Sequence, residues 1–378
     1  MLSSEQQYVL SLLRNSFGAT ITLPELGERE SRTVADYIMR NGVLLTVYHS
    51  MPSKLRDAIK VVYLASVAQT VNQIHEGKSI LGALSQAQID CIALKGMELR
   101  KLYPREHMRQ MADIDVLVRA YQYDAVSATM EKLGYQSDGE SSWKHDNFHR
   151  NDITVEIHKR LTDDSEFIQQ WENELWDRTT PTSTEGVYEM SKEDFYIFHF
   201  VHLHKDFMNG SLGLRRIVDT WLLEKQDSLD MQYIQEKLRQ FGMWTFHEKM
   251  TQLALAAMGE AKIDEDAEIL LCHAFKHGIY GSGKSYKTGR IVAMSSGSLK
   301  SGKLRSLVAA VFLPYSRMKA QFPALEKWPL LLPFYWVKRI CRFLSGDVRV
   351  YLKQLNYKNV DESDYAEMQA FFRAGGVR

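Results

Sequence analysis

The stretch 111–118 constrains the fold of this chain more than any other feature. It reads Met-Ala-Asp-Ile-Asp-Val-Leu-Val, with Asp113 and Asp115 at the head of an apolar run. Because side chains alternate between the two faces of a β-strand, the two carboxylates would share one face, and Ile114 would start the opposite, buried face. Mg²⁺ prefers a few carboxylates together with substrate phosphates. The stretch therefore predicts a strand that offers a hard cation its ligands.

Composition narrows the class of protein. The 378 residues are enough for two or three domains, and 45% hydrophobic with 25% charged residues is typical of a soluble globular chain. Lys plus Arg and Asp plus Glu both total 47, which argues against a dedicated nucleic-acid surface. No apolar run reaches the ~18 residues of a membrane span, and we expect no signal peptide.

The number and spacing of the cysteines indicate the redox environment of the protein. Cys91, Cys272 and Cys341 lie far apart in the chain and form neither a disulfide framework nor a zinc pattern. We therefore expect a reducing environment and a cytoplasmic protein.

Hydrophobic periodicity predicts an α+β fold in which a small mixed sheet is embedded between largely helical segments. We expect an N-terminal helical segment over 1–82, the α+β core over 83–162 and a helical domain over 163–276. Residues 277–378 are predicted as a Gly/Ser/Lys loop, extending to about residue 303, and an aromatic and basic helical tail.

The core is expected to contain four strands. Short apolar or alternating runs predict them at 89–94, 113–118, 145–150 and 153–158. Asn151-Asp152 suits a two-residue hairpin turn between the last two.

A third acid lies in the last of these strands. Glu156 shares its face with Thr154 and His158, while the alternating residues are apolar. If this strand lies beside the strand of Asp113 and Asp115, the three carboxylates converge. Such a triad can hold two divalent cations, one to activate a nucleophile and one to clamp a triphosphate.

Partners for phosphate lie nearby in the sequence. Lys95 and Arg109 are the nearest basic candidates, and Gly96 would let the backbone approach an anion closely. Each of these residues alone is more often a surface charge or a turn, and an isolated acid is often only solvated. Their combination within one small unit favours a site.

Several motifs together resemble the uncharacterised nucleotidyltransferase family of the DNA polymerase β-like superfamily. The resemblance spans roughly residues 30–360, and its specific motifs are Ala93–Gly96, Tyr103-Pro104, Arg109–Val118, Gly134-Tyr135, Val155–His158 and Leu214–Asp219. It implies Mg²⁺-dependent transfer of a nucleoside monophosphate from an NTP to an acceptor hydroxyl, with release of pyrophosphate. The acceptor is not indicated.

The resemblance also implies residue roles. Asp113 and Asp115 would be the metal-binding pair, Glu156 the third carboxylate, and two Mg²⁺ ions would be bound. The superfamily's usual Gly-Ser pair before the first aspartate is missing, since Gly96 lies well upstream and Met97 follows it. Lys95 and Arg109 are candidates to replace it.

Arg215 and Asp219 allow two interpretations. Four residues apart on one predicted helix, they could pair with each other. Through the resemblance, both could instead face the nucleotide cleft, with Arg215 as a nucleotide-binding residue. The rival for the whole chain is a non-catalytic nucleotide-sensing or scaffolding module.

Three further patterns are weaker. Residues 278–285 match the P-loop pattern letter for letter, but a P-loop needs a strand before it and a helix after it, and we predict a loop here. His199, His202 and His204 could bind zinc, although packing in a core is favoured. The tail segment 328–344 mixes Trp, Leu, Lys and Arg and could make a weak peripheral membrane contact, although packing on the helical domain is favoured.

Overall fold

The computed structural model describes residues 1–139, 144–161, 166–313, 315, 318–319, 322, 324–345, 357 and 359–377. The chain divides into two compact units. The first comprises Met1–His204 and Leu212–Ile279, and the second comprises Lys205–Ser211 and Tyr280–Arg378. None of the described helices is long and apolar enough to cross a membrane.

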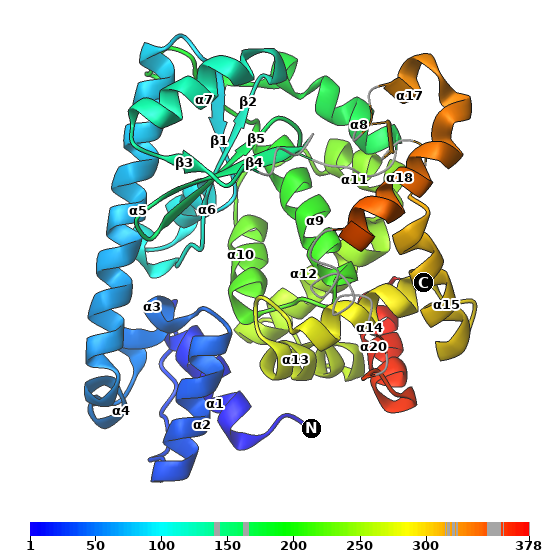
Figure 1. The fold of residues 1–378 in the computed structure, drawn as a ribbon. Helices are drawn as coiled ribbons and strands as arrows, with labels where there is room; N and C mark the ends of the chain where they lie inside the picture. Colours follow the sequence, from blue (N-terminus) through cyan, green and yellow to red (C-terminus); the bar gives the residue numbers. More distant parts are fainter. Residues whose placement is uncertain are drawn as a thin grey trace. The chain divides into compact units, whose positions relative to one another are not determined.

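One seven-stranded mixed sheet lies in the first unit (Figure 1). Its order is β3-β4-β5-β2-β1-β7-β6, in which β2 and β5, and also β1 and β7, run parallel. The strands are β1 (Cys91–Ala93), β2 (Ile114–Val118), β3 (Gln136–Ser137), β4 (His145–Arg150), β5 (Ile153–His158), β6 (Thr180–Pro181) and β7 (Val187–Glu189).

The predicted α+β fold, with a mixed sheet between helical segments, is confirmed. Each of the four predicted strands is present, and Arg150 pairs with Ile153 across the predicted hairpin turn. The sheet also extends beyond 83–162, because β6 and β7 add to the far side of β1. These strands of two and three residues are too short to leave an alternation in the sequence.

The apolar side of the sheet forms one hydrophobic core of the first unit. Ile114, Val116 and Val155 pack there against α5 (Lys60–Gln86) and α7 (Tyr123–Lys132). Residues at alternate positions of β2 and β5 face the opposite way, as the period of two requires. The polar side chains of the two strands are thereby brought to one side.

Helices make up most of the rest of the first unit (Figure 1). They are α1 (Ser4–Ser16), α2 (Glu28–Arg40), α3 (Leu44–Val47), α4 (Ser53–Ala58), α6 (Gly96–Leu99), α8 (Glu166–Asn173), α9 (Lys192–Met208, ending in the second unit), α10 (Leu214–Glu224), α11 (Met231–Gln240), α12 (Trp244–Met258) and α13 (Glu265–His277).

The described helices of the second unit are α14 (Gly283–Met294), α15 (Leu299–Val311), α17 (Ala324–Lys327), α18 (Leu332–Ser345) and α20 (Glu362–Ala374), with the 3₁₀ turn η6 (Pro329–Leu331) before α18. The prediction of a loop up to residue 303 is therefore wrong. Ser282 and Ser298 cap the N-termini of α14 and α15 through their hydroxyls. A Cβ on Gly302 would lie 2.5 Å from the Ile291 carbonyl oxygen, so this glycine permits close helix packing.

Candidate active site

Asp115 and Glu156 face each other across two parallel strands. In the β2–β5 register Asp115 pairs with Glu156, and both side chains lie on the side away from the apolar core. Ligand atoms of Asp115, Glu156 and His158 all lie within 4.8 Å of one another. The structure thus brings together two of the three acids that the sequence singled out.

Lys95 reaches these acids from a different strand. β1 runs antiparallel to β2, so the turn after β1 lies beside the start of β2. The Lys95 ammonium forms an ion pair with Asp115 and lies 3.9 Å from Glu156 Oε2. Its backbone has φ +39°, which is unfavourable for a residue with a side chain. A lysine held in such a conformation beside two carboxylates points to a functional constraint.

His158 is the residue whose role the sequence analysis missed. Its Nε2 donates to Asp115 Oδ1 at 2.8 Å and lies 3.3 Å from Glu156 Oε2. The same alternation that placed Glu156 on the polar face of β5 places His158 there, two residues later. This two-residue spacing from Glu156 is the signal by which the sequence could have indicated a role for His158.

The four groups shift one another's pKa values. Burial raises the pKa of Asp115, but the Lys95 ammonium and the hydrogen bond from His158 outweigh it and hold that pKa well below its usual range. The hydrogen bond from His158 is also the main cause of the lowered pKa of Glu156. Burial lowers the pKa of both His158 and Lys95, yet their carboxylate partners outweigh it and raise both. Both acids are therefore ionised at neutral pH, beside the Lys95 ammonium and the His158 imidazole.

Asp113 lies just outside β2 and does not belong to the group of ligand atoms within 4.8 Å. Burial, followed by the negative charge of Asp115, raises the pKa of Asp113 to about 6, and Lys95 partly offsets the shift. Asp113 is therefore close enough to interact with the cluster electrostatically.

Arg109 is buried against α10. Its Nε and Nη2 donate to the two carboxylate oxygens of Asp219 at 2.7 and 2.8 Å, and the Tyr103 hydroxyl donates to the same carboxylate at 2.9 Å. Asp219 therefore pairs with Arg109, whereas the sequence also allowed a pair with Arg215 on the same helix. The two motifs of the sequence, at 109–118 and 214–219, meet in this contact.

The segment before Asp113 is anchored from three helices. Thr46 Oγ1 of α3 donates to the Met108 carbonyl at 2.9 Å, and Gln73 Nε2 of α5 donates to the Ala112 carbonyl at 3.2 Å. Arg215 Nη1 of α10 donates to the Gln110 carbonyl at 2.7 Å. These bonds fix the backbone that delivers Asp113 and Asp115.

Gly96 lies where this anchored segment crosses the turn after β1. A Cβ on Gly96 would meet Met111 Sδ at 2.8 Å and Arg109 Nη1 at 3.0 Å. A side chain would therefore push apart the turn that carries Lys95 and the segment that carries the aspartates.

The predicted histidine cluster on α9 is packed. His199 Nε2 bonds Thr220 Oγ1 at 2.9 Å, and burial lowers the pKa of His199 to about 3. The His204 ring lies edge-on to Phe246, and burial lowers its pKa to about 4. These contacts agree with the favoured packing role.

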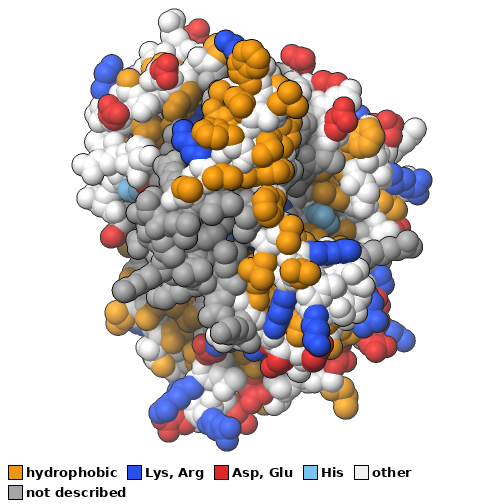
Figure 2. Space-filling model, turned by 45° about the vertical axis from the view of Figure 1, so that its right-hand side comes forward, with side chains coloured by type: hydrophobic (Ala, Val, Ile, Leu, Met, Phe, Trp, Pro, Cys, Tyr) orange, Lys and Arg blue, Asp and Glu red, His pale blue; other side chains and the backbone are white. Residues whose placement is uncertain are grey.

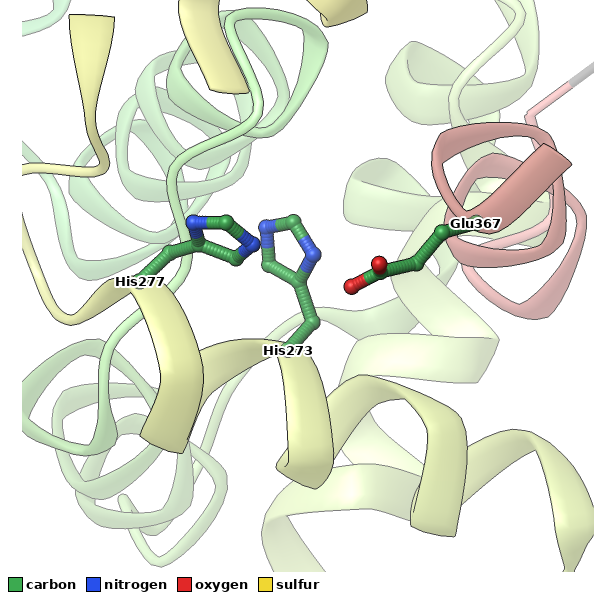
Figure 3. A group of neighbouring side chains, drawn as sticks. All are labelled: His273, His277 and Glu367. Carbon is green, nitrogen blue, oxygen red and sulfur yellow. The ribbon is translucent and has the colours of Figure 1, made fainter. Parts of the chain in front are cut away.

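Another pair of histidines lies on α13. His273 and His277 are one turn apart, with ring centroids separated by 4.4 Å, and both extend from the same side of the helix (Figure 3). They belong to the first unit but to none of the strands that carry the acids, and we assign them no part in the site.

The residues fit a hard cation. Asp115 and Glu156 offer carboxylate oxygens, and the Lys95 ammonium already places a positive charge between them. Two carboxylates and a lysine gathered on the polar side of the central strands have the chemistry of a site for a divalent cation and a polyphosphate, as nucleotidyl-transfer sites do.

The comparison with protein families agrees with this class. The model of the family described as uncharacterised nucleotidyltransferase matches residues 30–259, which is more than half of the chain, and the chain belongs to that family. Neither the curated proteins nor the solved structures gave a match. The match covers the sheet, the anchored segment and α10.

Proposed function

We propose that this chain transfers a nucleoside monophosphate from an NTP to an acceptor hydroxyl in a Mg²⁺-dependent reaction that releases pyrophosphate. One observation carries the proposal: Asp115 lies opposite Glu156 on parallel strands, with the Lys95 ammonium beside both. The family match supports the same class of reaction. Placement in the DNA polymerase β-like superfamily is part of the proposal.

Asp115 and Glu156 would hold the cations, and Asp113 would turn in to join them. Two bound Mg²⁺ ions would neutralise the triphosphate and lower the pKa of the attacking hydroxyl. The acceptor oxygen attacks the α-phosphorus, the bond from that phosphorus to the oxygen of the β-phosphate breaks, and pyrophosphate leaves. We assign the hydroxyl proton to Glu156, whose side chain is 24% exposed.

Phosphate contacts are proposed for Lys95, for Gly96 and for Arg215. A bound cation would replace the Lys95 ammonium at Asp115, and the freed side chain would pair with a phosphate. The Arg215 charge already acts on Asp113 from α10. Arg109 is proposed to position the segment before the aspartates, because two of its donors bind Asp219.

Label transfer tests the proposal. Each NTP, labelled at the α-phosphate, is incubated with the protein, Mg²⁺ and a cell extract. We expect one NTP to lose pyrophosphate and to label a product that also identifies the acceptor. Asp115→Asn should abolish the transfer, whereas Asp152→Asn, on the exposed hairpin turn, should leave it unchanged.

A non-catalytic nucleotide-sensing or scaffolding module is the alternative. It is favoured by the contacts that Lys95 and His158 both make with Asp115, which already give this carboxylate two polar partners within the chain. Binding of an NTP without pyrophosphate release in any extract would support this alternative over the enzyme. We also propose the cytoplasm, where NTPs and Mg²⁺ are available, as the site of action.

A further inference from the structure

The second unit exposes large apolar side chains on α15, η6 and α18. In α15 they are Leu304, Leu307 and Val308, which are three and four positions apart and so share one face of the helix. In η6, Leu330 is 95% exposed. Large apolar side chains usually pack in a core, so the exposure of several of them in one unit marks a feature of its surface.

α18 continues this surface. Phe334 and Val337 are exposed on its outer face, together with Lys338. On its inner side Trp336 Nε1 donates to the Leu313 carbonyl at 3.0 Å, and the Trp336 and Phe312 rings meet edge-on with centroids 5.3 Å apart. The helix is therefore docked on the end of α15 with apolar residues directed outward.

We define the α15/α18 face by Leu304, Leu307, Val308, Leu330, Phe334 and Val337. Figure 2 turns toward the viewer the side of Figure 1 that carries α17 and α18, and shows hydrophobic side chains gathered in a band with Lys and Arg side chains beside it. An apolar patch of this kind on a water-exposed protein marks an interaction surface.

The charge of the same segment is strongly one-sided. Residues 280–345 contain twelve lysines and arginines but a single acid, Glu326, in a chain whose net charge is zero. Glu326 is itself paired with Lys319 at 2.9 Å. Lys300, Lys327 and Lys338 of this segment are exposed, so the segment presents positive charge as well as apolar side chains to solvent.

We propose that the α15/α18 face binds the surface of a bilayer that contains anionic phospholipids. Apolar and aromatic side chains would enter the interface while the basic side chains contact headgroups. A second copy of the chain fits less well, because a two-fold interface would set one basic surface against another. At about 1.5 Å per residue, the 14 residues of α18 reach only about 21 Å, so the helix would lie on the membrane rather than cross it.

This inference goes beyond the proposed function. The α15/α18 face lies outside residues 30–259, which the family model matches. Its test measures membrane binding and not nucleotide turnover. The membrane proposal and the proposed nucleotidyl transfer can therefore fail independently of each other.

Vesicle flotation of the full chain tests the proposal. We expect the protein to float at low salt with vesicles of phosphatidylcholine and phosphatidylglycerol, and to stay soluble with phosphatidylcholine alone. The double variant Leu330→Ser, Phe334→Ser should bind at least about tenfold more weakly. Lys327→Gln and Lys338→Gln should each weaken binding about fivefold.

Val61→Ser is the matched control, because Val61 is an apolar residue of α5 that is 81% exposed in the first unit. It should bind vesicles like the wild type. Circular dichroism and an unchanged melting temperature establish that each variant is folded. The proposal is overturned if the wild type stays soluble at low salt, or if Leu330→Ser, Phe334→Ser floats as well as Val61→Ser. It is also overturned if sedimentation shows a dimer that this double variant abolishes, since a second copy would then occupy the face.

Discussion

At the scale of single residues, Asp113 and Asp115 have opposite electrostatic environments. Asp113 has a pKa raised to about 6, so the fold disfavours its charged form. Asp115 has a lowered pKa, because Lys95 and His158 outweigh its burial and favour its charged form. Two aspartates of one motif therefore affect the stability of the metal-free protein in opposite directions.

Asp113→Asn should stabilise the metal-free protein. The folded pKa exceeds the ordinary value of 3.8, so the charge of Asp113 destabilises the fold increasingly as the pH rises from about 4 to above 6. Asparagine stays neutral throughout. We expect the free energy of unfolding to rise by roughly 1–3 kcal/mol at pH 8 and to be unchanged near pH 3.5. Denaturant titrations in EDTA at several pH values measure the free energy of unfolding. An equal effect of the substitution at pH 8 and at pH 3.5 would contradict the prediction.

Asp115→Asn should destabilise the metal-free protein. The substitution leaves Lys95 and His158 without their main counter-charge in a site where Asp115 itself is 2% exposed. Removing one partner of a buried ion pair costs about 3 kcal/mol. Because the folded pKa is lowered, this loss should be seen at pH 7 and should shrink as the pH falls below about 4. The same titrations would argue against the ion-pair geometry if this variant matched the wild type at pH 7.

At the scale of elements, the segment before Asp113 depends on helices far away in the sequence. Thr46, Gln73 and Arg215 each bond one of its carbonyl groups. The acids would therefore be positioned by α3, α5 and α10 as much as by the sheet.

Thr46→Val tests this dependence without touching a charged group. The change keeps the shape of the side chain but leaves the buried Met108 carbonyl without its donor, at a cost of about 1–2 kcal/mol. We expect NTP turnover to fall about tenfold or more with little change in KM, because misplacement of reacting groups lowers kcat. Thr33→Val, which removes a similar bond to the Arg29 carbonyl on exposed α2, is the control and should leave turnover intact. Equal turnover in both variants would show that the anchor does not matter.

The elements also show which features could be predicted from the sequence. β2 and β5 were predictable because alternation is unambiguous when one face is buried, and the same pattern predicted which acids share a side. The partners of the Lys95, His158 and Arg109 side chains could not be predicted. Those partners, Asp115 and Asp219, are brought into contact by the register of the strands and by helix packing. The loop prediction before residue 303 failed because Ser282 and Ser298 cap helices and Gly302 permits their close approach.

At the scale of the whole molecule, the proposed nucleotide site and most of the P-loop-like stretch belong to different units. The acids, Lys95 and the anchored segment all belong to the first unit. Residues 278–285 follow α13 and not a strand, although α14 begins within them at Gly283. Lys284 pairs with Asp364 at 2.7 Å within the second unit. The stretch therefore lacks the strand that a P-loop requires.

Lys284→Ala should accordingly leave NTP affinity within a few-fold of the wild type. Equilibrium binding of a labelled NTP measures the affinity, with Lys95→Ala as the comparison that should weaken it. A loss of about a hundredfold in Lys284→Ala would revive the P-loop interpretation and move the nucleotide to the second unit.

The central claim is that Asp115 and Glu156 together hold divalent cations when an NTP is bound. Mn²⁺ in place of Mg²⁺ allows a direct test, because the electron paramagnetic resonance signal of free Mn²⁺ disappears on binding. With a non-hydrolysable NTP, the wild type should bind about two Mn²⁺ per chain, and Asp115→Asn and Glu156→Gln should each lose this binding while Asp152→Asn keeps it. Undiminished Mn²⁺ binding by both Asp115→Asn and Glu156→Gln would contradict the account.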